Sequence, residues 1–225
     1  MTKRMSSAEA ADQERRRLGE MLRLERALWR SGLSRVAGVD EVGVGPLAGP
    51  VVAAAVVFEP GTEIPGVDDS KRLSPRRREA LAEIIRARAA GIGIGIGSIE
   101  DIARLNIYHA ALEAMRRAVE ALPRPPERLL VDARTIPGLS MPQDPYVKGD
   151  GLSFSIAAAS IVAKTYRDGL MADLDGAYPG YGFAAHKGYD TPEHRAALAR
   201  LGPCPEHRMS YRTVRDLCGA PSTAG

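Results

Sequence analysis

The sequence predicts an α/β protein whose core is a mixed sheet flanked by helices. Five short segments carry strand patterns, and helical patterns separate and follow them. Residues 51–58 form an apolar run without charge, which is typical of a strand buried on both faces. At 225 residues, with 44% hydrophobic and 26% charged residues, the chain can form one good-sized domain with a modest appendage.

The composition excludes several classes of protein. No run of about eighteen apolar residues occurs, so neither a transmembrane helix nor a membrane partner is expected. The basic N-terminus leads into polar residues without an apolar segment, so no signal peptide is expected. Two cysteines are too few for a disulfide framework, which favours a cytoplasmic location. The net charge of +3 and a pI near 9.0, with clustered basic residues, suit a nucleic-acid partner.

Residues 1–35 are expected to form a tail and one helix rather than a separate folded domain. The first seven residues are polar and are expected to be disordered. From Ala8 to Arg30 an apolar stripe recurs at helical spacing opposite an arginine-rich side. This pattern predicts a solvated helix that packs its stripe on the domain, and nucleic-acid contact by the arginines is the less favoured alternative.

The candidate chemistry is concentrated where the first strand, Val36 to Asp40, ends in two adjacent carboxylates, Asp40 and Glu41. The glycine- and proline-rich turn from Gly43 to Pro46 joins this strand to the buried one that follows. Acids at the mouth of a buried sheet are costly unless a divalent cation neutralises them, and bare glycines let backbone amides approach a ligand. Because adjacent strand residues point to opposite faces, Glu41 is expected at or past the strand end.

Two further acids follow later strand patterns. Asp132 lies near the carboxyl end of Arg128–Ala133, and Asp150 follows the short strand Tyr146–Lys148. Four convergent carboxylates repel one another unless two divalent cations balance them, and oxygen ligands select Mg²⁺ or Mn²⁺. Two such ions about 4 Å apart can activate water on one side of a phosphodiester and stabilise the leaving oxygen on the other.

The remaining patterns complete the sheet and its helical cover. Ser74 and a first-turn proline open a helix that runs to Arg88 with Leu81, Ile84 and Ile85 facing inward. Its start, beside Ser70 and Lys71, is either an anion site or only a capped surface helix. The other elements are an alternating Gly–Ile strand over 91–99, an amphipathic helix over 105–122 and an alanine-rich helix over 153–174.

The C-terminal region mixes aromatic residues with Lys and Arg, which suits base stacking and phosphate contact. Two short helices are expected, over 191–201 and up to Leu217. Cys204 and His207 have a zinc-like spacing, but no second pair completes four ligands, so a zinc site is not favoured. Asp168 lies beside Arg167, which favours an ion pair or a capping role over metal binding.

The segment DEVGVGPLAGPVVAAAVVF, residues 40–58, resembles the signature of the ribonuclease HII family, Asp-Glu-x-Gly-Arg-Gly-Pro-Leu-Ala-Gly-Pro. One departure is plain, since Val44 stands where the family has arginine. The resemblance extends from Val36 to Val214 through the segments DSKRLS, LLVDA, VKGD, SIAAASIVAK and YGFAAHKGY.

This resemblance implies a ribonuclease H-like five-stranded mixed sheet over 36–176 with a helical substrate-binding extension over 177–225. It also implies endonucleolytic cleavage of RNA paired with DNA, leaving a 3′-hydroxyl and a 5′-phosphate. Incision 5′ to a single ribonucleotide in duplex DNA would be included. The family's four metal-binding and catalytic acids correspond to Asp40, Glu41, Asp132 and Asp150.

The resemblance also suggests how the substrate is read. Backbone groups of Gly43, Val44 and Gly45 are expected to read the 2′-hydroxyl, and Tyr189 is expected to stack near the DNA side of an RNA–DNA junction. The other expected substrate contacts are Ser70, Lys71 and Lys148. The missing arginine at position 44 removes a charge-assisted contact worth about 1.5–3 kcal/mol, which predicts weakened substrate binding or altered junction preference with the metal site intact.

The sequence disfavours three other classes of protein. A type 3 ribonuclease H carries a sizeable extra N-terminal domain, and the 35 residues before the motif read as one helix. A hybrid-binding protein without activity would have no reason to keep four costly carboxylates, and a junction resolvase or integrase would not need the glycine loop and Tyr189 together. A monomer is expected, because the sequence shows no exposed apolar stripe.

Overall fold

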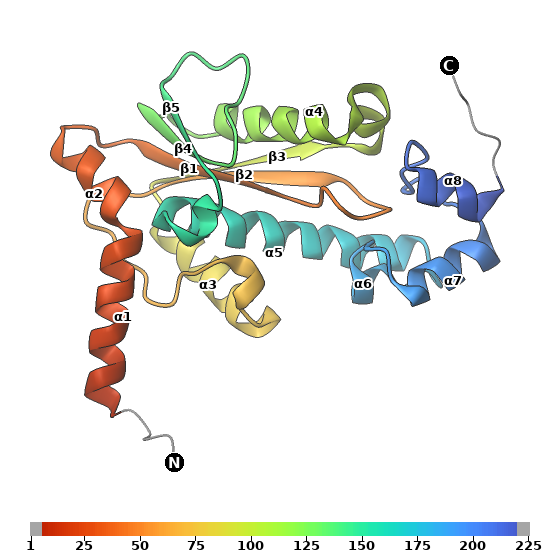
Figure 1. Cartoon of the computed structure of the whole chain (residues 1–225), viewed down its shortest axis with the longest axis horizontal. Helices are drawn as coiled ribbons and strands as arrows, with labels where there is room; N and C mark the ends of the chain where they lie inside the picture. Colours follow the sequence, from red (N-terminus) through yellow and green to blue (C-terminus); the bar gives the residue numbers. More distant parts are fainter. Residues whose placement is uncertain (1–5, 220–225) are drawn as a thin grey trace.

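The computed structural model describes residues 6–219, and a five-stranded mixed sheet with helices on both faces forms its core (Figure 1). The strands are β1 (Val36–Val42), β2 (Val51–Val57), β3 (Gly91–Gly97), β4 (Arg128–Asp132) and β5 (Gln143–Tyr146). Their order across the sheet is β3-β2-β1-β4-β5. β1 pairs antiparallel with β2, which pairs antiparallel with β3, whereas β4 runs parallel to both β1 and β5. The predicted fold class is therefore confirmed.

The helices are α1 (Ser7–Met21), α2 (Arg23–Arg30), α3 (Pro75–Arg88), α4 (Ile99–Glu120), α5 (Phe154–Ala177), α6 (Phe183–His186), α7 (Pro192–Leu201) and α8 (Arg212–Cys218). Two short 3₁₀ turns are η1 (Ser70–Arg72) and η2 (Gly149–Gly151). In Figure 1, α4 covers one face of the sheet, α5 and α3 cover the other, and α6–α8 gather at the far end of α5. Separate apolar clusters fill the two interfaces. Within residues 6–219, no helix combines the length and the hydrophobicity needed to cross a membrane.

The strand β3 alternates glycine and isoleucine, so each of these residue types lies on one face of the sheet. Its isoleucines pack against the cluster shared with α5, whereas its glycines lie under α4. A Cβ on Gly93 would lie 2.0 Å from the carbonyl oxygen of Ala118, and one on Gly95 would lie 1.9 Å from that of Ala114. The glycines therefore allow the α4 backbone to rest directly on the sheet.

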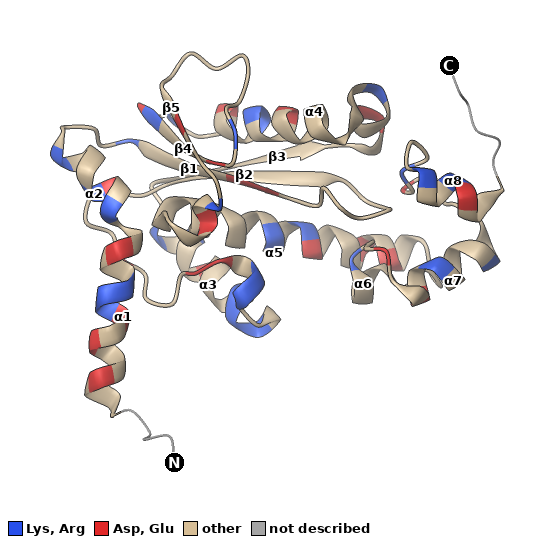
Figure 2. Cartoon of the chain, viewed as in Figure 1, with Lys and Arg blue, Asp and Glu red and all other residues tan. Residues whose placement is uncertain are grey.

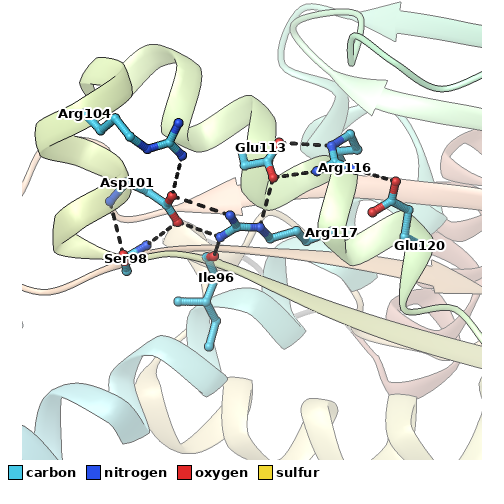
Figure 3. A network of polar contacts seen from close by, with 8 residues as sticks. All are labelled: Ile96, Ser98, Asp101, Arg104, Glu113, Arg116, Arg117 and Glu120. Atoms are coloured by element: carbon cyan, nitrogen blue, oxygen red, sulfur yellow. Dashed lines mark hydrogen bonds and ion pairs between the residues drawn. The ribbon is translucent and has the colours of Figure 1, made fainter.

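The helix α4 starts earlier than predicted and contains a kink. It begins at Ile99, and Asn106 within it has a φ of 67°. A polar network joins the segments on either side of this kink (Figure 3). Arg117 contacts Asp101 and the carbonyl of Ile96, each at 2.6 Å. Hydrogen bonds from Arg117 lower the pKa of Asp101 to about 2, so this carboxylate stays charged and orients Arg117, which ties α4 to β3 through the Ile96 carbonyl.

The predicted N-terminal helix is two helices. Leu18, Met21 and Leu22 of its apolar stripe are buried as expected and the later part of the stripe is partly buried, but the chain turns at Leu22 and continues as α2. The turn brings Glu25 of α2 onto the start of α5, where this fully buried carboxylate accepts hydrogen bonds from Ser153 Oγ at 2.5 Å and from the Ser155 N–H at 2.8 Å. The break therefore serves a contact between elements that are distant in sequence.

Three smaller predictions are corrected. Ile84 was expected to face inward but is exposed, because Leu81 and Ile85 already fill the contact with the core. The last strand is Gln143–Tyr146 rather than 146–148, since Lys148 adopts a left-handed conformation that ends the extended segment. Residues 1–5 of the expected tail lie outside the described residues, whereas Ser6 caps α1 and Ser7 begins it.

Candidate active site

Three carboxylates converge where the two central parallel strands stop pairing. The last register pair of β1 and β4 is Val39 with Val131, and the next residues along each strand are Asp40, Glu41 and Asp132. Oxygen atoms of these three side chains, one from each, all lie within 4.8 Å of one another. We call them the acid cluster. Figure 2 shows acidic residues in the middle of the sheet, whereas acidic and basic residues are interspersed over the helices.

The expectation that Glu41 lies at or past the strand end is wrong. β1 continues to Val42, and Glu41 is paired with Ala53 of β2. On the other side, pairing with β4 has already stopped, so that edge of β1 is open at Glu41. The end of the parallel pairing, rather than the end of the strand, therefore lets both neighbours share one site.

Electrostatics in the acid cluster disfavour three separate negative charges. Burial, followed by the charges of Glu41 and Asp132, raises the pKa of Asp40 well above its usual range. Burial also raises the pKa of Glu41, opposed by the positive charge of Arg134, and that of Asp132. In addition, Glu41 Oε2 is buried without a hydrogen-bond partner. Repelling oxygen donors with an unsatisfied buried oxygen fit a divalent cation.

Asp150 lies next to the acid cluster but outside its set of mutually close oxygens. Its carboxylate, in η2, is 3.2 Å from Lys71 Nζ. The neighbouring Gly149 N–H donates to Asp132 Oδ1 at 2.7 Å, and the charge of Asp150 helps to raise the pKa of Asp132. Ser153, which Glu25 holds, in turn donates its N–H to the Gly149 carbonyl at 2.8 Å.

Two buried arginines hold the glycine loop, residues 43–50, by hydrogen bonds to its carbonyl groups. We call Arg167 and Arg208 the arginine clamp. Arg208 donates to the carbonyls of Gly43, Val44 and Gly49 at 2.6–3.0 Å. Arg167 donates to the carbonyls of Ala48 and Pro50. Neither guanidinium has a carboxylate partner within salt-bridge distance among residues 6–219, and burial lowers the pKa of both. The loop carbonyls therefore face the interior.

The loop also lies beside Tyr189. A Cβ on Gly45 would be 3.9 Å from Tyr189 Cε1, so the bare glycine backbone adjoins the ring. Tyr189 and Val44 are both partly exposed. Gly43 has a φ of +95°, and a Cβ there would meet Arg167 Nε at 2.3 Å, so only glycine fits between the loop and the clamp.

The other predicted contact residues differ in accessibility. Lys148 is exposed, and Lys71 reaches Asp150 with its ammonium while most of its side chain remains exposed. Ser70 is buried instead, and its hydroxyl lies 2.9 Å from Ser160 Oγ. Ser160 hydrogen-bonds Asp40, so Ser70 reaches the acid cluster through a second hydroxyl.

The expected ion pair of Asp168 forms, but with Lys164 at 2.6 Å and Arg78 at 3.9 Å, because Arg167 points to the loop carbonyls. Cys204 and His207 do contact each other, with Sγ 3.2 Å from Nδ1. No common ion could join them to His194, since His207 faces His194 with its other nitrogen. Within residues 6–219, the acid cluster is the only group of three close metal-ligating side chains.

Sequence reasoning missed three residues around the site. Ser160 bonds Asp40, the charge of Arg134 opposes the rise in the pKa of Glu41 that burial causes, and Lys164 Nζ lies 5.9 Å from the Tyr189 ring centroid. Arg134 follows Asp132 by two residues, and this closeness in sequence could have indicated a cation beside the acid cluster. The other two lie on α5, and its small residues indicated only close packing.

A mixed sheet of five strands with an acid cluster at its centre, between helices on both faces, defines a metal-dependent nuclease of the ribonuclease H-like class. A protein-family model described as ribonuclease HII matches residues 37–214. The chain belongs to the ribonuclease HII family, whose members are metal-dependent endonucleases that act on RNA–DNA hybrids.

Individual relatives agree with this assignment. The ribonuclease HII of Myxococcus xanthus is 54% identical over 210 residues, which cover 93% of this chain and 72% of that protein. The Geobacter sulfurreducens ribonuclease HII is 54% identical over 190 residues, 84% of this chain and 88% of that protein. The crystal structure of ribonuclease H2 from Pyrococcus horikoshii aligns with a TM-score of 0.70 and 25% identity, over 82% of this chain and 97% of that one.

Proposed function

We propose that this chain cleaves the RNA strand of RNA–DNA hybrids and incises 5′ to single ribonucleotides in duplex DNA, leaving a 3′-hydroxyl and a 5′-phosphate. The observation that carries the proposal is the acid cluster, in which the buried Asp40 and the partly buried Glu41 and Asp132 bring repelling carboxylates together and Glu41 Oε2 has no hydrogen-bond partner. Asp40, Glu41, Asp132 and Asp150 would hold two divalent cations, Mg²⁺ or Mn²⁺. When bound, such ions lower the pKa of a coordinated water and stabilise a leaving phosphodiester oxygen.

The chain's own residues prepare this site for a phosphodiester. The Gly149 N–H fixes one Asp132 oxygen, which leaves the other for a cation. Ser160 bonds Asp40, and Lys71 offsets the charge of Asp150 while remaining near the solvent edge. Lys71 and Lys148 would contact phosphates of the substrate, and the Ser70 hydroxyl would act through Ser160.

Recognition of the ribonucleotide would depend on the glycine loop and Tyr189. The arginine clamp and Tyr211 occupy the loop carbonyls, and the 43–45 segment keeps its bare backbone beside the tyrosine ring. Backbone groups of Gly43, Val44 and Gly45 would hydrogen-bond the 2′-hydroxyl. The Tyr189 ring would stack on the next sugar and favour a deoxyribose there, because a 2′-hydroxyl would crowd the ring.

The proposed function also divides the chain into three segments. We propose 1–35 as an N-terminal appendage, 36–176 as the catalytic core and 177–225 as a substrate-binding extension, working as a monomer. In support, α6–α8 pack in two small apolar clusters that they share with Leu47 and Ala48 of the glycine loop and Met171 of α5, and the exposed large apolar side chains come from several separate segments. The cytoplasmic location expected from the two cysteines stays a prediction.

The test is cleavage of an end-labelled DNA duplex that contains one ribonucleotide, with Mg²⁺, with Mn²⁺ and with a chelator. Incision 5′ to the ribonucleotide, with a ligatable 5′-phosphate on the downstream product, is expected only with metal. Asp132→Asn should lower the rate by more than about a hundredfold, since even partners that only orient a metal ligand are worth 10–100-fold.

Asp173→Asn, an exposed carboxylate on α5, is the matched control and should cleave normally. A duplex that is bound but not cut with either metal would refute the catalytic proposal and favour a hybrid-binding role.

A further inference from the structure

Three of the chain's four histidines, His186, His194 and His207, pack against one another near Tyr189. They lie in the C-terminal region, which contributes no residue to the acid cluster. His194 on α7 and His207, between α7 and α8, are 0% and 1% exposed. Their Nε2 atoms lie 3.1 Å apart, and His186 stacks on His194 with ring centroids 4.3 Å apart. Two ring nitrogens at this distance must divide the roles of donor and acceptor between them.

The Tyr189 carbonyl decides which nitrogen carries each proton. It can only accept, and His194 Nδ1 lies 2.9 Å from it, so Nδ1 carries the proton of this ring. In the neutral ring, His194 Nε2 must then accept from His207 Nε2–H. His207 Nδ1 is left to accept the Cys204 N–H at 3.0 Å. One assignment of neutral rings thus satisfies these three hydrogen bonds, and the Cys204 carbonyl, 3.3 Å from His207 Nδ1, then receives no proton from that ring. We call the run Cys204 N–H, His207, His194 and Tyr189 carbonyl the histidine chain.

The environment keeps these rings neutral. Burial lowers the pKa of His194, and it lowers that of His207 to about 4. Aromatic rings of Tyr181 and Phe183 pack around them, and the charged neighbour that favours protonation of His194 is Asp190. A proton added to either ring would place two N–H groups face to face.

The histidine chain joins the two elements proposed to read the substrate. At one end, the His207 backbone forms an antiparallel bridge with Ala48 of the glycine loop. At the other end is the Tyr189 carbonyl, which also accepts the Thr191 N–H at 3.0 Å. The adjacent Gly188 carbonyl accepts the Leu47 N–H at 2.8 Å, and a Cβ on Gly188 would meet the Ala48 oxygen at 2.5 Å. A shift of the 188–189 backbone would therefore move the Tyr189 ring relative to Gly45.

We propose that His194, oriented by His207, is a positioning residue that sets Tyr189 against the glycine loop and thereby contributes to the preference for a deoxyribose after the ribonucleotide. The proposal rests on the proposed function of Tyr189. His194 touches neither the acid cluster nor exposed surface, and of its two hydrogen bonds the one to the Tyr189 carbonyl leads directly to the residue proposed to read the sugar.

Two substitutions of His194 separate its two hydrogen bonds. In His194→Asn, the side-chain amide lies at the level of Nδ1 and can still donate to the Tyr189 carbonyl. In His194→Gln, the amide lies at the level of Nε2 and retains the contact with His207 instead. The measured quantity is the ratio of kcat/KM on a duplex with one ribonucleotide to kcat/KM on a continuous RNA–DNA hybrid.

His194→Gln should lower this ratio about three- to tenfold, the worth of one hydrogen bond, whereas His194→Asn should keep it within about twofold. In a Tyr189→Ala background, His194→Gln should have no further effect on the ratio. His109→Asn, at an exposed histidine of α4, is the control and should change neither rate. Equal losses on both substrates, or a full effect of His194→Gln without the tyrosine, would reduce His194 to a purely structural residue and overturn the proposal.

Imidazole ¹⁵N spectra of the wild-type protein test the histidine chain without activity or variants. Neutral His194 protonated on Nδ1 and neutral His207 protonated on Nε2 are expected. The opposite tautomers would overturn the inference even if cleavage is normal. Expected tautomers in a protein without preference for the single ribonucleotide would instead refute the proposed role of Tyr189.

Discussion

The acid cluster includes two residues of β1, the strand that precedes the glycine loop, and the arginine clamp binds the carbonyls of that loop, yet the two groups differ in how their buried charges are compensated. In the cluster, like charges crowd together and Glu41 Oε2 has no partner. In the clamp, Arg208 uses all three guanidinium nitrogens on loop carbonyls and the Tyr211 hydroxyl. The clamp has all its hydrogen-bond partners within the protein, whereas the cluster keeps a buried oxygen without one. The contrast distinguishes the acid cluster, whose carboxylates are available to bind a ligand, from the arginine clamp, which fixes the conformation of the loop.

The largest expected effect comes from neutralising the cluster. Asp40→Asn should lower cleavage by more than about a hundredfold, yet in chelator it should raise the free energy of unfolding by about 1 kcal/mol or more, because it removes one of the repelling charges. The measurement is urea unfolding with chelator and with Mn²⁺, together with the cleavage assay. Mn²⁺ should stabilise the wild type more than the variant. A variant less stable than the wild type in chelator would contradict the assignment of repulsion to this cluster.

Removing the clamp should have the opposite sign. Arg208→Met leaves the buried carbonyls of Gly43, Val44 and Gly49 short of donors, which should lower the free energy of unfolding by about 3 kcal/mol. Arg212→Met removes an exposed arginine of α8 and should stay within about 0.5 kcal/mol. If both variants unfold alike, the clamp is not the framework of the loop.

The contrast also explains what the sequence could and could not predict. Strand patterns predicted the mixed sheet, and they placed Asp40 and Asp132 near the ends of neighbouring strands, but β1 continues to Val42 and the geometry of Glu41 was not predicted. The break at Leu22 was not predictable, because its reason is the contact of Glu25 with α5, which lies far along the chain. The arginine clamp was hidden likewise, since Arg208 looks like any basic residue until its carbonyl partners are known.

Acidification should act on the histidine chain. His207 has a folded-state pKa of about 4 against an unfolded value near 6.5, so its neutral form stabilises the fold fully above about pH 6.5. That contribution, about 3 kcal/mol at most, is lost as the pH falls towards 4. Unfolding measured from pH 7.5 to 4.5 should show a slope that His207→Gln reduces. His109→Gln should leave the slope unchanged. A slope equal in all three proteins would assign the acid sensitivity to carboxylates.

The smallest expected effect concerns Val44, the loop residue between the two regions, where the ribonuclease HII signature has arginine. Its carbonyl is held by Arg208 and Tyr211, and its side chain is partly exposed, so Val44→Arg can add a cation without disturbing the loop. A charge-assisted phosphate contact of about 1.5–3 kcal/mol should raise kcat/KM on a single-ribonucleotide duplex about tenfold or more.

Salt distinguishes the charge from the size of the new side chain. The gain in kcat/KM from Val44→Arg should shrink as salt rises from 50 to 200 mM, because contacts between a cation and a phosphate weaken with salt. Val44→Met, which adds length without charge, should show no gain. Metal affinity should be unchanged in both variants, because position 44 adjoins the acid cluster only through the loop backbone. Kinetics identical to those of the native chain would mean that the loop reads the substrate through its backbone alone.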